Sequence, residues 1–215
     1  MGNKIVINKI LNSFKKKIEI EGDKSLSIRC ALLASQTTGK TKIINLLKSE
    51  DVINTLNSLK KLGVEYKFNK KKCEINGLGL NGYKYKKNLI LDAGNSGTLA
   101  RLIIGLLIHA KEKVKIIGDK SLSKRDFYRV TKPLEKFGAK FKTNNGKLPI
   151  TIEGTTNPKS IYYTESKGSA QCKSAIMLAG LNTKGVTFIK AKKSRNHSEL
   201  LFKNLKIPIK TIRKK

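Results

Sequence analysis

Three short segments of this chain combine glycine, small polar residues and a cation or amide. They are Gly22-Asp23-Lys24-Ser25, Gly94-Asn95-Ser96-Gly97-Thr98 and Lys167-Gly168-Ser169-Ala170-Gln171. Glycine lets backbone N–H groups approach a ligand closely, and hydroxyl or amide side chains can hydrogen-bond its oxygens. Each segment stands at the start of a predicted helix, where unpaired N–H groups favour negative charge. Together the segments predict a site for phosphate or carboxylate groups, although the first segment alone fits an ordinary capped helix equally well.

Arginine is used sparingly, since only six of the 46 basic residues are Arg. The planar guanidinium group binds phosphate or carboxylate through two parallel hydrogen bonds, which the Lys ammonium group does not. Four of the six fall in or just after the three segments or in the connection that follows: Arg29, Arg101, Arg125 and Arg195. We expect geometry to matter at these places. For Arg101, one turn inside its predicted helix, a partner in the protein interior is an equal alternative.

The elements that position these segments recur three times, about every 70 residues. Each copy opens with an apolar strand, the small-residue loop and a helix, predicted over 18–35, 89–107 and 161–180. Second strands follow over 39–46, 111–119 and 185–191, and then a helix and hairpin over 51–77 and 126–154. The third copy restarts at 198 without a hairpin. The period fits a βαβαββ unit, so we predict an α/β (α+β) fold of three pseudo-symmetric units with their helices inward, the third incomplete.

The net charge of +31 permits binding to a polyanion. The lysines are nevertheless scattered through predicted strands, turns and helices, and Trp is absent. A dedicated nucleic-acid surface is expected to use more Arg, with aromatic residues for stacking. We therefore interpret the charge as a lysine-rich composition and expect no specific nucleic-acid partner.

Length and composition indicate a folded protein with a sizeable core. No run approaches the ~18 apolar residues that span a bilayer, and the first residues lack the pattern of a signal peptide. Three cysteines, Cys30, Cys73 and Cys172, are odd in number and lack metal-ligand spacing. We expect a cytoplasmic protein without membrane association, whose cysteines are small core residues and not metal ligands.

Five linked motifs carry a family resemblance: GDKSLSIRCALLAS, GKTKIINLLKSEDVINTLNSLKKLGV, LDAGNSGTLARLIIGLL, GDKSLSKRDFYRVTKPLEKFGA and SAQCKSAIMLAGLNTKGVT. In order, spacing and residue identity these motifs closely resemble the 3-phosphoshikimate 1-carboxyvinyltransferase (EPSP synthase) family across residues 15–205. The related UDP-N-acetylglucosamine enolpyruvyl transferases are less similar. Their first motif has Lys-Asn where this chain has Lys24-Ser25, and their reactive-loop cysteine has no counterpart near Ser121–Arg125.

The resemblance implies transfer of the enolpyruvyl group of phosphoenolpyruvate to the 5-hydroxyl of shikimate 3-phosphate, in the shikimate pathway to chorismate and the aromatic amino acids. No metal or organic cofactor is implied. By motif match, shikimate 3-phosphate would contact Lys24, Ser25, Arg29, Ser169, Ala170, Gln171, Ser194 and Arg195. Phosphoenolpyruvate would contact Lys24, Asn95, Gly97, Thr98, Arg125 and Gln171. Departures from the family pattern are Glu21 before Gly22, Asp126 after Arg125 and Asn196 after Arg195; none of them removes a ligand.

The family enzyme has a second domain of the same kind, and the resemblance covers only the first, over 15–215, without its last hairpin. It implies that residues 1–14 supply a strand between domains and that the acid and base groups belong to the second domain. No catalytic group is therefore expected here. We expect these 215 residues to be inactive by themselves, with a separately encoded second domain as a possible partner.

Two other functions compete with this interpretation. RNA 3′-terminal phosphate cyclases resemble the repeat fold, and the charge would suit a nucleic-acid-binding protein. The cyclase active-site His pattern is missing, however, because the only histidines are His109 and His197. The second alternative is an interaction module that has lost catalysis.

Overall fold

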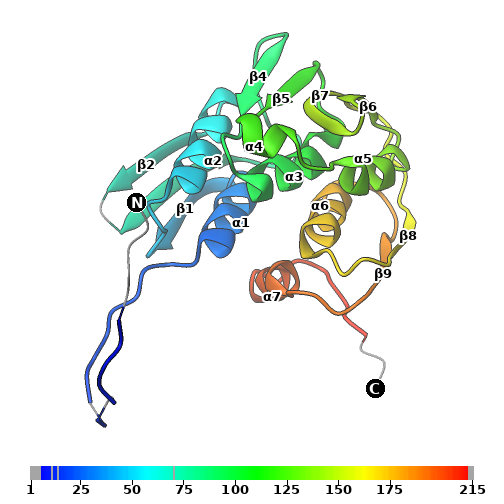
Figure 1. The fold of residues 1–215 in the computed structure, drawn as a ribbon. Helices are drawn as coiled ribbons and strands as arrows, with labels where there is room; N and C mark the ends of the chain where they lie inside the picture. Colours follow the sequence, from blue (N-terminus) through cyan, green and yellow to red (C-terminus); the bar gives the residue numbers. More distant parts are fainter. Residues whose placement is uncertain (1–5, 11, 14, 70, 213–215) are drawn as a thin grey trace.

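The computed structural model describes residues 6–10, 12, 13, 15–69 and 71–212. Its first unit is a three-stranded antiparallel sheet with two helices (Figure 1). The strand order is β1-β3-β2, so the hairpin folds back and places β3 in the centre. The elements are α1 (Lys24–Ala34), β1 (Thr38–Ile44), α2 (Glu50–Lys61), β2 (Glu65–Asn69) and β3 (Lys72–Leu78).

The second unit repeats this arrangement with one more strand. Its sheet has the order β4-β5-β7-β6, in which β4 is parallel to β5 and the other pairs are antiparallel. The strands are β4 (Leu89–Asp92), β5 (Val114–Ile117), β6 (Lys140–Asn144) and β7 (Lys147–Glu153). The helices are α3 (Gly97–Leu106), the 3-10 helix η1 (Leu107–His109), α4 (Lys120–Ser123) and α5 (Tyr128–Glu135).

The third unit has the same opening and, in the part of the chain that the structure describes, only two strands. Its elements are β8 (Tyr162–Glu165), α6 (Ala170–Gly180), β9 (Phe188–Ala191) and α7 (His197–Asn204). Strands β8 and β9 are parallel, as β4 and β5 are in the second unit. The predicted α/β fold of repeated units, with a shorter third unit, is therefore confirmed.

The strand predicted to open the first unit at Ile18 is wrong, because residues 15–23 form neither a helix nor a strand. Ile18 and Ile20 are 72% and 79% exposed, so an alternating strand here would have no apolar face to bury. The counterpart β4 buries Leu91 in the core. In the segment 1–14, residues 1–5, 11 and 14 lie outside the described residues. The remaining ones are exposed and without regular structure, and the predicted role of the segment between domains stays a prediction.

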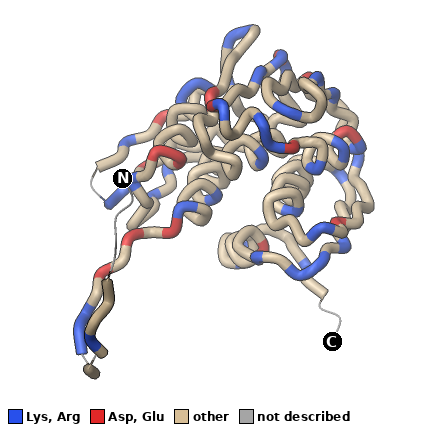
Figure 2. The backbone as a smooth tube through the Cα atoms, viewed as in Figure 1, with Lys and Arg blue, Asp and Glu red and all other residues tan. Residues whose placement is uncertain are grey.

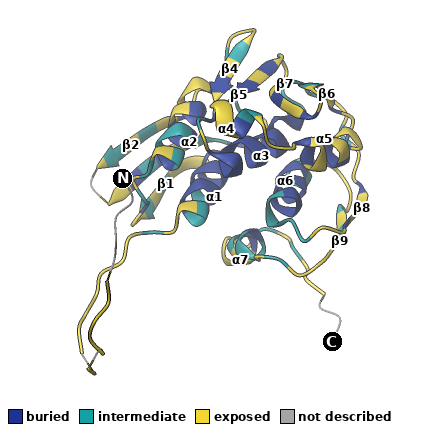
Figure 3. Ribbon diagram, viewed as in Figure 1, coloured by how far each residue is buried: buried dark blue, intermediate teal, exposed yellow. Residues whose placement is uncertain are grey.

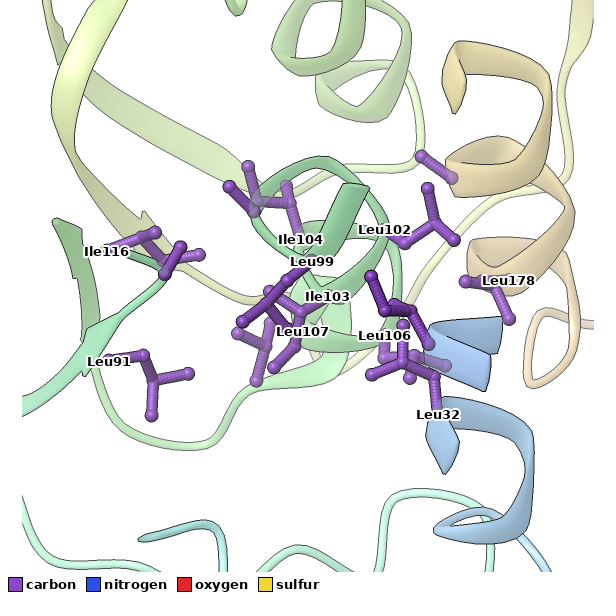
Figure 4. Packing of buried hydrophobic residues seen from close by; sticks show 14 of the residues in the cluster. Leu32, Leu91, Leu99, Leu102, Ile103, Ile104, Leu106, Leu107, Ile116 and Leu178 are labelled. Carbon is purple, nitrogen blue, oxygen red and sulfur yellow. The ribbon is translucent and has the colours of Figure 1, made fainter. Parts of the chain in front are cut away.

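The core is built from helices that face one another inside the three sheets (Figure 1). Helix α3 is its centre, and all of its residues are buried (Figure 3). Figure 4 shows leucines of α3 between Leu32 of α1 and Leu178 of α6, with Ile116 of β5 on the sheet side. At Gly105 an added Cβ would lie 2.2 Å from the carbonyl oxygen of Ala175, so a glycine lets α3 and α6 approach closely.

Basic residues are spread over all three units and do not form one stripe (Figure 2). This distribution agrees with the interpretation of the charge as compositional. Within the described residues, no helix is long and apolar enough to cross a membrane.

Candidate anion-binding site

The three small-residue segments lead into α1, α3 and α6, as predicted. In each case a side chain at the N-cap accepts a hydrogen bond from a backbone N–H in the first turn. Asp23 accepts from Leu26 at 2.7 Å. Ser96 and Ser169 accept from Leu99 and Cys172 at 3.3 and 3.2 Å. One N–H group per helix is thus satisfied within the protein, and anion binding depends on the remaining ones and on side chains.

A fourth segment, not predicted as part of the site, lies against the second one. The hexapeptide GDKSLS occurs at 22–27 and again at 118–123, and this repetition is the signal by which the sequence could have shown it. Asp119 caps α4 through the N–H of Leu122 at 2.6 Å, and its own N–H donates to the carbonyl of Gly94 at 2.9 Å. Asp119 also accepts from the amide of Asn95. The Leu122 N–H, followed by Asn95, holds the pKa of the Asp119 carboxyl below its usual value.

Arg125 follows this fourth segment and points to the second one. Its Nη2 donates to Oδ1 of Asn95 at 3.1 Å, so the Asn95 amide bridges Arg125 and Asp119. An added Cβ at Gly97 would lie 3.0 Å from Nη1 of Arg101 and 3.1 Å from Nη1 of Arg125. The structure therefore brings three predicted residues, Asn95, Gly97 and Arg125, together and adds Arg101 to them.

Arg101 connects the second and third units. Its Nη1 donates to Oε1 of Gln171 at 2.7 Å, and its Nη2 donates to the carbonyl of Asp126 at 3.2 Å. Nε2 of Gln171 then donates to Oγ1 of Thr98 at 3.0 Å. The guanidinium group also stacks over the Phe127 ring, 4.9 Å from its centroid. Burial, with the neighbouring Arg129 and Arg125, lowers the pKa of Arg101.

Asn95, Gly97, Thr98, Arg101, Arg125 and Gln171 form a continuous set of contacts, which we call the arginine cluster. Asn95 lies just before α3, and Gly97, Thr98 and Arg101 lie in its first turns. Arg125 follows the fourth segment, and Gln171 lies in the first turn of α6. Ser169 is the N-cap of α6 and Ala170 its first residue, so both lie next to Gln171 at the border of the arginine cluster.

Arg29 is the centre of a second group, the serine cluster, formed by Ser25, Arg29, Ser174 and Ser198. Arg29 donates from Nη1 to the carbonyl of Ser25 at 3.0 Å and from Nε to Oγ of Ser198 at 3.0 Å. Nη2 donates to Oγ of Ser174 at 3.2 Å, and the two serine hydroxyls lie 2.7 Å apart. Sequence reasoning missed Ser174 and Ser198. The available signal was the spacing of Ser174, three residues after Gln171 on the same helix face.

Arg29, which the family resemblance assigns to shikimate 3-phosphate, is enclosed by protein groups in this structure. The residue is only 5% exposed, and all three guanidinium nitrogens are hydrogen-bonded within the protein. Burial lowers the pKa of Arg29 and the nearby Arg195 lowers it further, while Asp23 and Glu199 oppose the shift. A direct contact between Arg29 and a substrate stays a prediction.

Buried Glu165 organises the loop before α6. Its two carboxylate oxygens accept from the backbone N–H groups of Lys167 at 3.1 Å and Ser169 at 2.8 Å. These N–H groups are therefore engaged by the protein. A ligand at this loop would therefore meet the start of α6 and the side chains of Ser169 and Gln171.

The remaining predicted residues lie around the two clusters. Lys24 is half-exposed and forms an ion pair with Asp51 at 2.9 Å. Arg195 is exposed, yet close enough to affect the pKa of Arg29. The hydroxyl of Ser194 is buried and has no partner among the described residues. Ser194 and Arg195 are thus near the serine cluster, whereas Lys24 is held at the start of α1.

Of the three cysteines predicted to be core residues, Cys73 and Cys172 are buried, whereas Cys30 is only partly buried. Cys172 is buried, as predicted, and its Sγ lies 2.9 Å from the carbonyl oxygen of Arg129. Burial raises the pKa of the Cys172 thiol to about 11, which keeps it protonated and unreactive. Among the residues described, no three His, Cys, Asp or Glu side chains gather in a way that could hold a metal ion.

Comparisons with known proteins agree with this fold and place the chain in a family. A model of the family "EPSP synthase (3-phosphoshikimate 1-carboxyvinyltransferase)" matches residues 9–215. The 3-phosphoshikimate 1-carboxyvinyltransferase of Ruthia magnifica subsp. Calyptogena magnifica is 44% identical over 193 residues, which is 89% of this chain and 44% of that protein. Its namesake from Streptococcus agalactiae serotype Ia is 41% identical over 191 residues, which is 87% of this chain and 44% of that one. The solved EPSP synthase of Acinetobacter baumannii superposes with a TM-score of 0.87 at 36% identity, covering 93% of this chain and 45% of that one.

The fold defines an α/β protein of repeated units whose helices pack against one another inside the sheets. The chain belongs to the EPSP synthase family. It spans less than half the length of the curated relatives that it matches.

Proposed function

We propose that these residues form one face of a site that binds phosphoenolpyruvate and shikimate 3-phosphate, for transfer of the enolpyruvyl group between them. The observation that carries the proposal is the arginine cluster, in which two units of the fold meet through Arg101, Gln171 and Thr98. Family membership supports the choice of substrates. Both substrates carry a phosphate and a carboxylate, which suits a surface of Arg, Lys and helix N-termini.

The arginine cluster is the proposed place of phosphoenolpyruvate. Arg125 is exposed, and its guanidinium group can donate two parallel hydrogen bonds. Because Gly97 has no side chain, there is room for the phosphate beside this guanidinium group. Asn95 holds Arg125 in place through its amide oxygen. The cluster therefore presents fixed hydrogen-bond donors, as a multiply charged anion requires.

The proposed place of shikimate 3-phosphate lies between the serine cluster and the start of α6. Ser169, Ala170 and Gln171 would line it on one side, with Ser25, Ser194 and Arg195 on the other. Since Arg29 is enclosed by protein groups, its contribution in this structure is to hold α1, α6 and α7 together. Lys24, paired with Asp51, would have to leave that carboxylate to reach either substrate.

The chemistry needs groups beyond these clusters. In the proposed reaction the 5-hydroxyl oxygen adds to C2 of phosphoenolpyruvate while C3 gains a proton. Phosphate then leaves C2 as C3 loses a proton. The acids at the loops are already engaged: Asp23 and Asp119 cap helices, and Glu165 accepts from two backbone N–H groups. We therefore place the proton transfers in the remainder of the family enzyme.

The test is phosphate release from the two substrates in four parallel reactions. These contain the 215 residues, a separately made second half of a family enzyme, both together, or neither. We expect turnover only when both are present, because closure of two faces excludes water and completes the site. Turnover by the 215 residues alone would show that the proton-transfer groups lie within them. A complemented mixture that binds neither substrate would overturn the proposed function.

A further inference from the structure

We propose that Arg101 is a positioning residue that fixes the side-chain amide of Gln171, so that its NH2 group and not its oxygen is offered to the ligand. This inference rests on the proposed function, in which Gln171 contacts the substrates. Arg101 itself touches no substrate in this proposal, because it is 9% exposed and its Nη groups are engaged by Gln171 and Asp126.

The orientation of Gln171 follows from the chemistry of its two neighbours. A guanidinium group has only donors, so the atom 2.7 Å from Nη1 of Arg101 must be the amide oxygen. The reversed amide would place its NH2 group against a cation that also donates. Nε2 then faces Thr98, whose hydroxyl oxygen accepts one of its two N–H bonds at 3.0 Å. The second N–H of Gln171 and the hydroxyl hydrogen of Thr98 stay available.

As a consequence, the side chains that would face the ligand present hydrogen-bond donors to it. Arg125 supplies guanidinium N–H groups, Gln171 its second amide N–H, and Thr98 its hydroxyl hydrogen. Such a surface favours ligands with several acceptor oxygens, such as a deprotonated phosphate next to a carboxylate. Ligands that present donors of their own would leave donors unpaired at the site.

A second observation points to the same role. Arg101 is buried without a carboxylate within 4.0 Å in the described part of the chain, and its Nε has no hydrogen-bond partner there. A buried cation without an acidic partner is unfavourable for folding. Arg125 and Arg129 add like charge nearby, and only Asp126 opposes them. A purely structural contact to Gln171 would not need a charge, whereas an anion beside the cluster would benefit from it.

The test uses the 215 residues labelled with 15N, so that the side-chain NH2 signals of Gln171 are visible without any ligand. The signals are assigned by their disappearance in Gln171→Glu. The variants are Arg101→Lys, which keeps the charge, Arg101→Met, which removes it, and the control Arg129→Gln. Arg129 lies nearby on α5, pairs with Asp126 at 3.4 Å and makes no hydrogen bond to Gln171. Backbone amide spectra establish that each variant is folded, and phosphoenolpyruvate is titrated into each.

We expect the Gln171 amide protons to exchange slowly in the unaltered chain and in Arg129→Gln. In Arg101→Met they should exchange as in a solvent-exposed glutamine, with a loss of about tenfold or more in affinity for phosphoenolpyruvate. Arg101→Lys should restore the affinity in part, because the charge remains. Unchanged Gln171 signals in a folded Arg101→Met chain would overturn the inference.

Gln171→Glu keeps the test decisive if the Arg101 variants do not fold. The new carboxylate would still accept from Arg101 but would have no N–H to offer, so we expect retained folding and lost affinity for phosphoenolpyruvate. Affinity equal to that of the unaltered chain would overturn the inference. If the unaltered chain binds no phosphoenolpyruvate, the titrations are repeated with the second half of a family enzyme present, and absence of binding there overturns the proposed function. The ligand-free Gln171 signals of the Arg101 variants decide the positioning role in either case.

Discussion

Two guanidinium groups approach the backbone of Gly97, and this single residue sets the space between them. We predict that Gly97→Ala lowers affinity for phosphoenolpyruvate, because a methyl group 3.0–3.1 Å from Arg101 and Arg125 moves both groups. The free energy of unfolding should change by less than about 1 kcal/mol, because the higher helix propensity of Ala offsets part of the cost of crowding. Calorimetric titration and urea unfolding measure the two effects. Unchanged affinity would contradict the placement of the ligand beside Gly97.

Arg125 is the exposed cation of the same cluster. Arg125→Ala should remove a charge-assisted hydrogen bond of about 1.5–3 kcal/mol, or about one to two decades of affinity for phosphoenolpyruvate. Shikimate 3-phosphate should be affected far less. Arg129→Ala serves as the matched control, since Arg129 is exposed nearby but outside the cluster. Equal losses for the two substrates would contradict the assignment of Arg125 to phosphoenolpyruvate.

The buried thiols predict a loss of stability at alkaline pH. Burial raises the pKa of Cys73 and Cys172 to about 11 in the folded chain, whereas an unfolded thiol titrates near ~8.5. The unfolded state therefore loses these protons first and gains stability as pH rises from about 9 to 11, at about 1.4 kcal/mol for each unit of pKa difference. Urea unfolding across this range should show a smaller decline in the Cys73→Ala, Cys172→Ala double variant. An equal decline of the unfolding free energy in the variant and the unaltered chain would show that Cys73 and Cys172 do not cause it.

At the scale of single elements, the loop before α6 depends on one buried carboxylate. Glu165 is 4% exposed and accepts two backbone N–H bonds. Glu165→Gln replaces one acceptor oxygen by a donor, which should cost about 1–3 kcal/mol of unfolding free energy. The control is Glu153→Gln, whose half-exposed ion pair with Lys113 should contribute less than about 1 kcal/mol. Equal effects in chemical denaturation would mean that the loop does not depend on Glu165.

Most elements followed from the sequence because their signals are local. Small-residue N-caps and apolar periodicity located α1, α3 and α6, and the period of the repeat gave the fold. The strand expected at Ile18 failed because its formation depends on a buried face that this segment lacks. The short helix α4 was missed, although the repeated hexapeptide GDKSLS marks its start.

The site was less accessible to sequence reasoning than the fold. Asn95, Gly97, Thr98, Arg125 and Gln171 were named from their motifs, and the structure brings them together. The contacts between side chains of different units could not be predicted from the sequence. Ser198, for example, lies 169 residues from Arg29 along the chain, and no local pattern indicates such a pair.

At the scale of the whole molecule, the charge of +31 has its own consequence. Because the cations are dispersed, binding to RNA should be weak, independent of base sequence and lost as salt rises from roughly 50 to 200 mM. Titration of two unrelated RNA oligonucleotides at several salt concentrations measures this. Affinity that depends on sequence and survives at the higher salt would favour the nucleic-acid-binding alternative.

Helix α6 contacts both clusters: Gln171 belongs to the arginine cluster and Ser174, about one turn later on the same face, to the serine cluster. In the proposed function the two clusters serve different substrates, and any coupling between them is reciprocal: whatever one occupant does to the affinity of the second, the second does to the first. The order in which two molecules arrive then changes the path but not the final free energy. Because α6 contacts both clusters, we expect this helix to carry such a coupling, so that each of two neighbouring anions changes the affinity for the other without touching it.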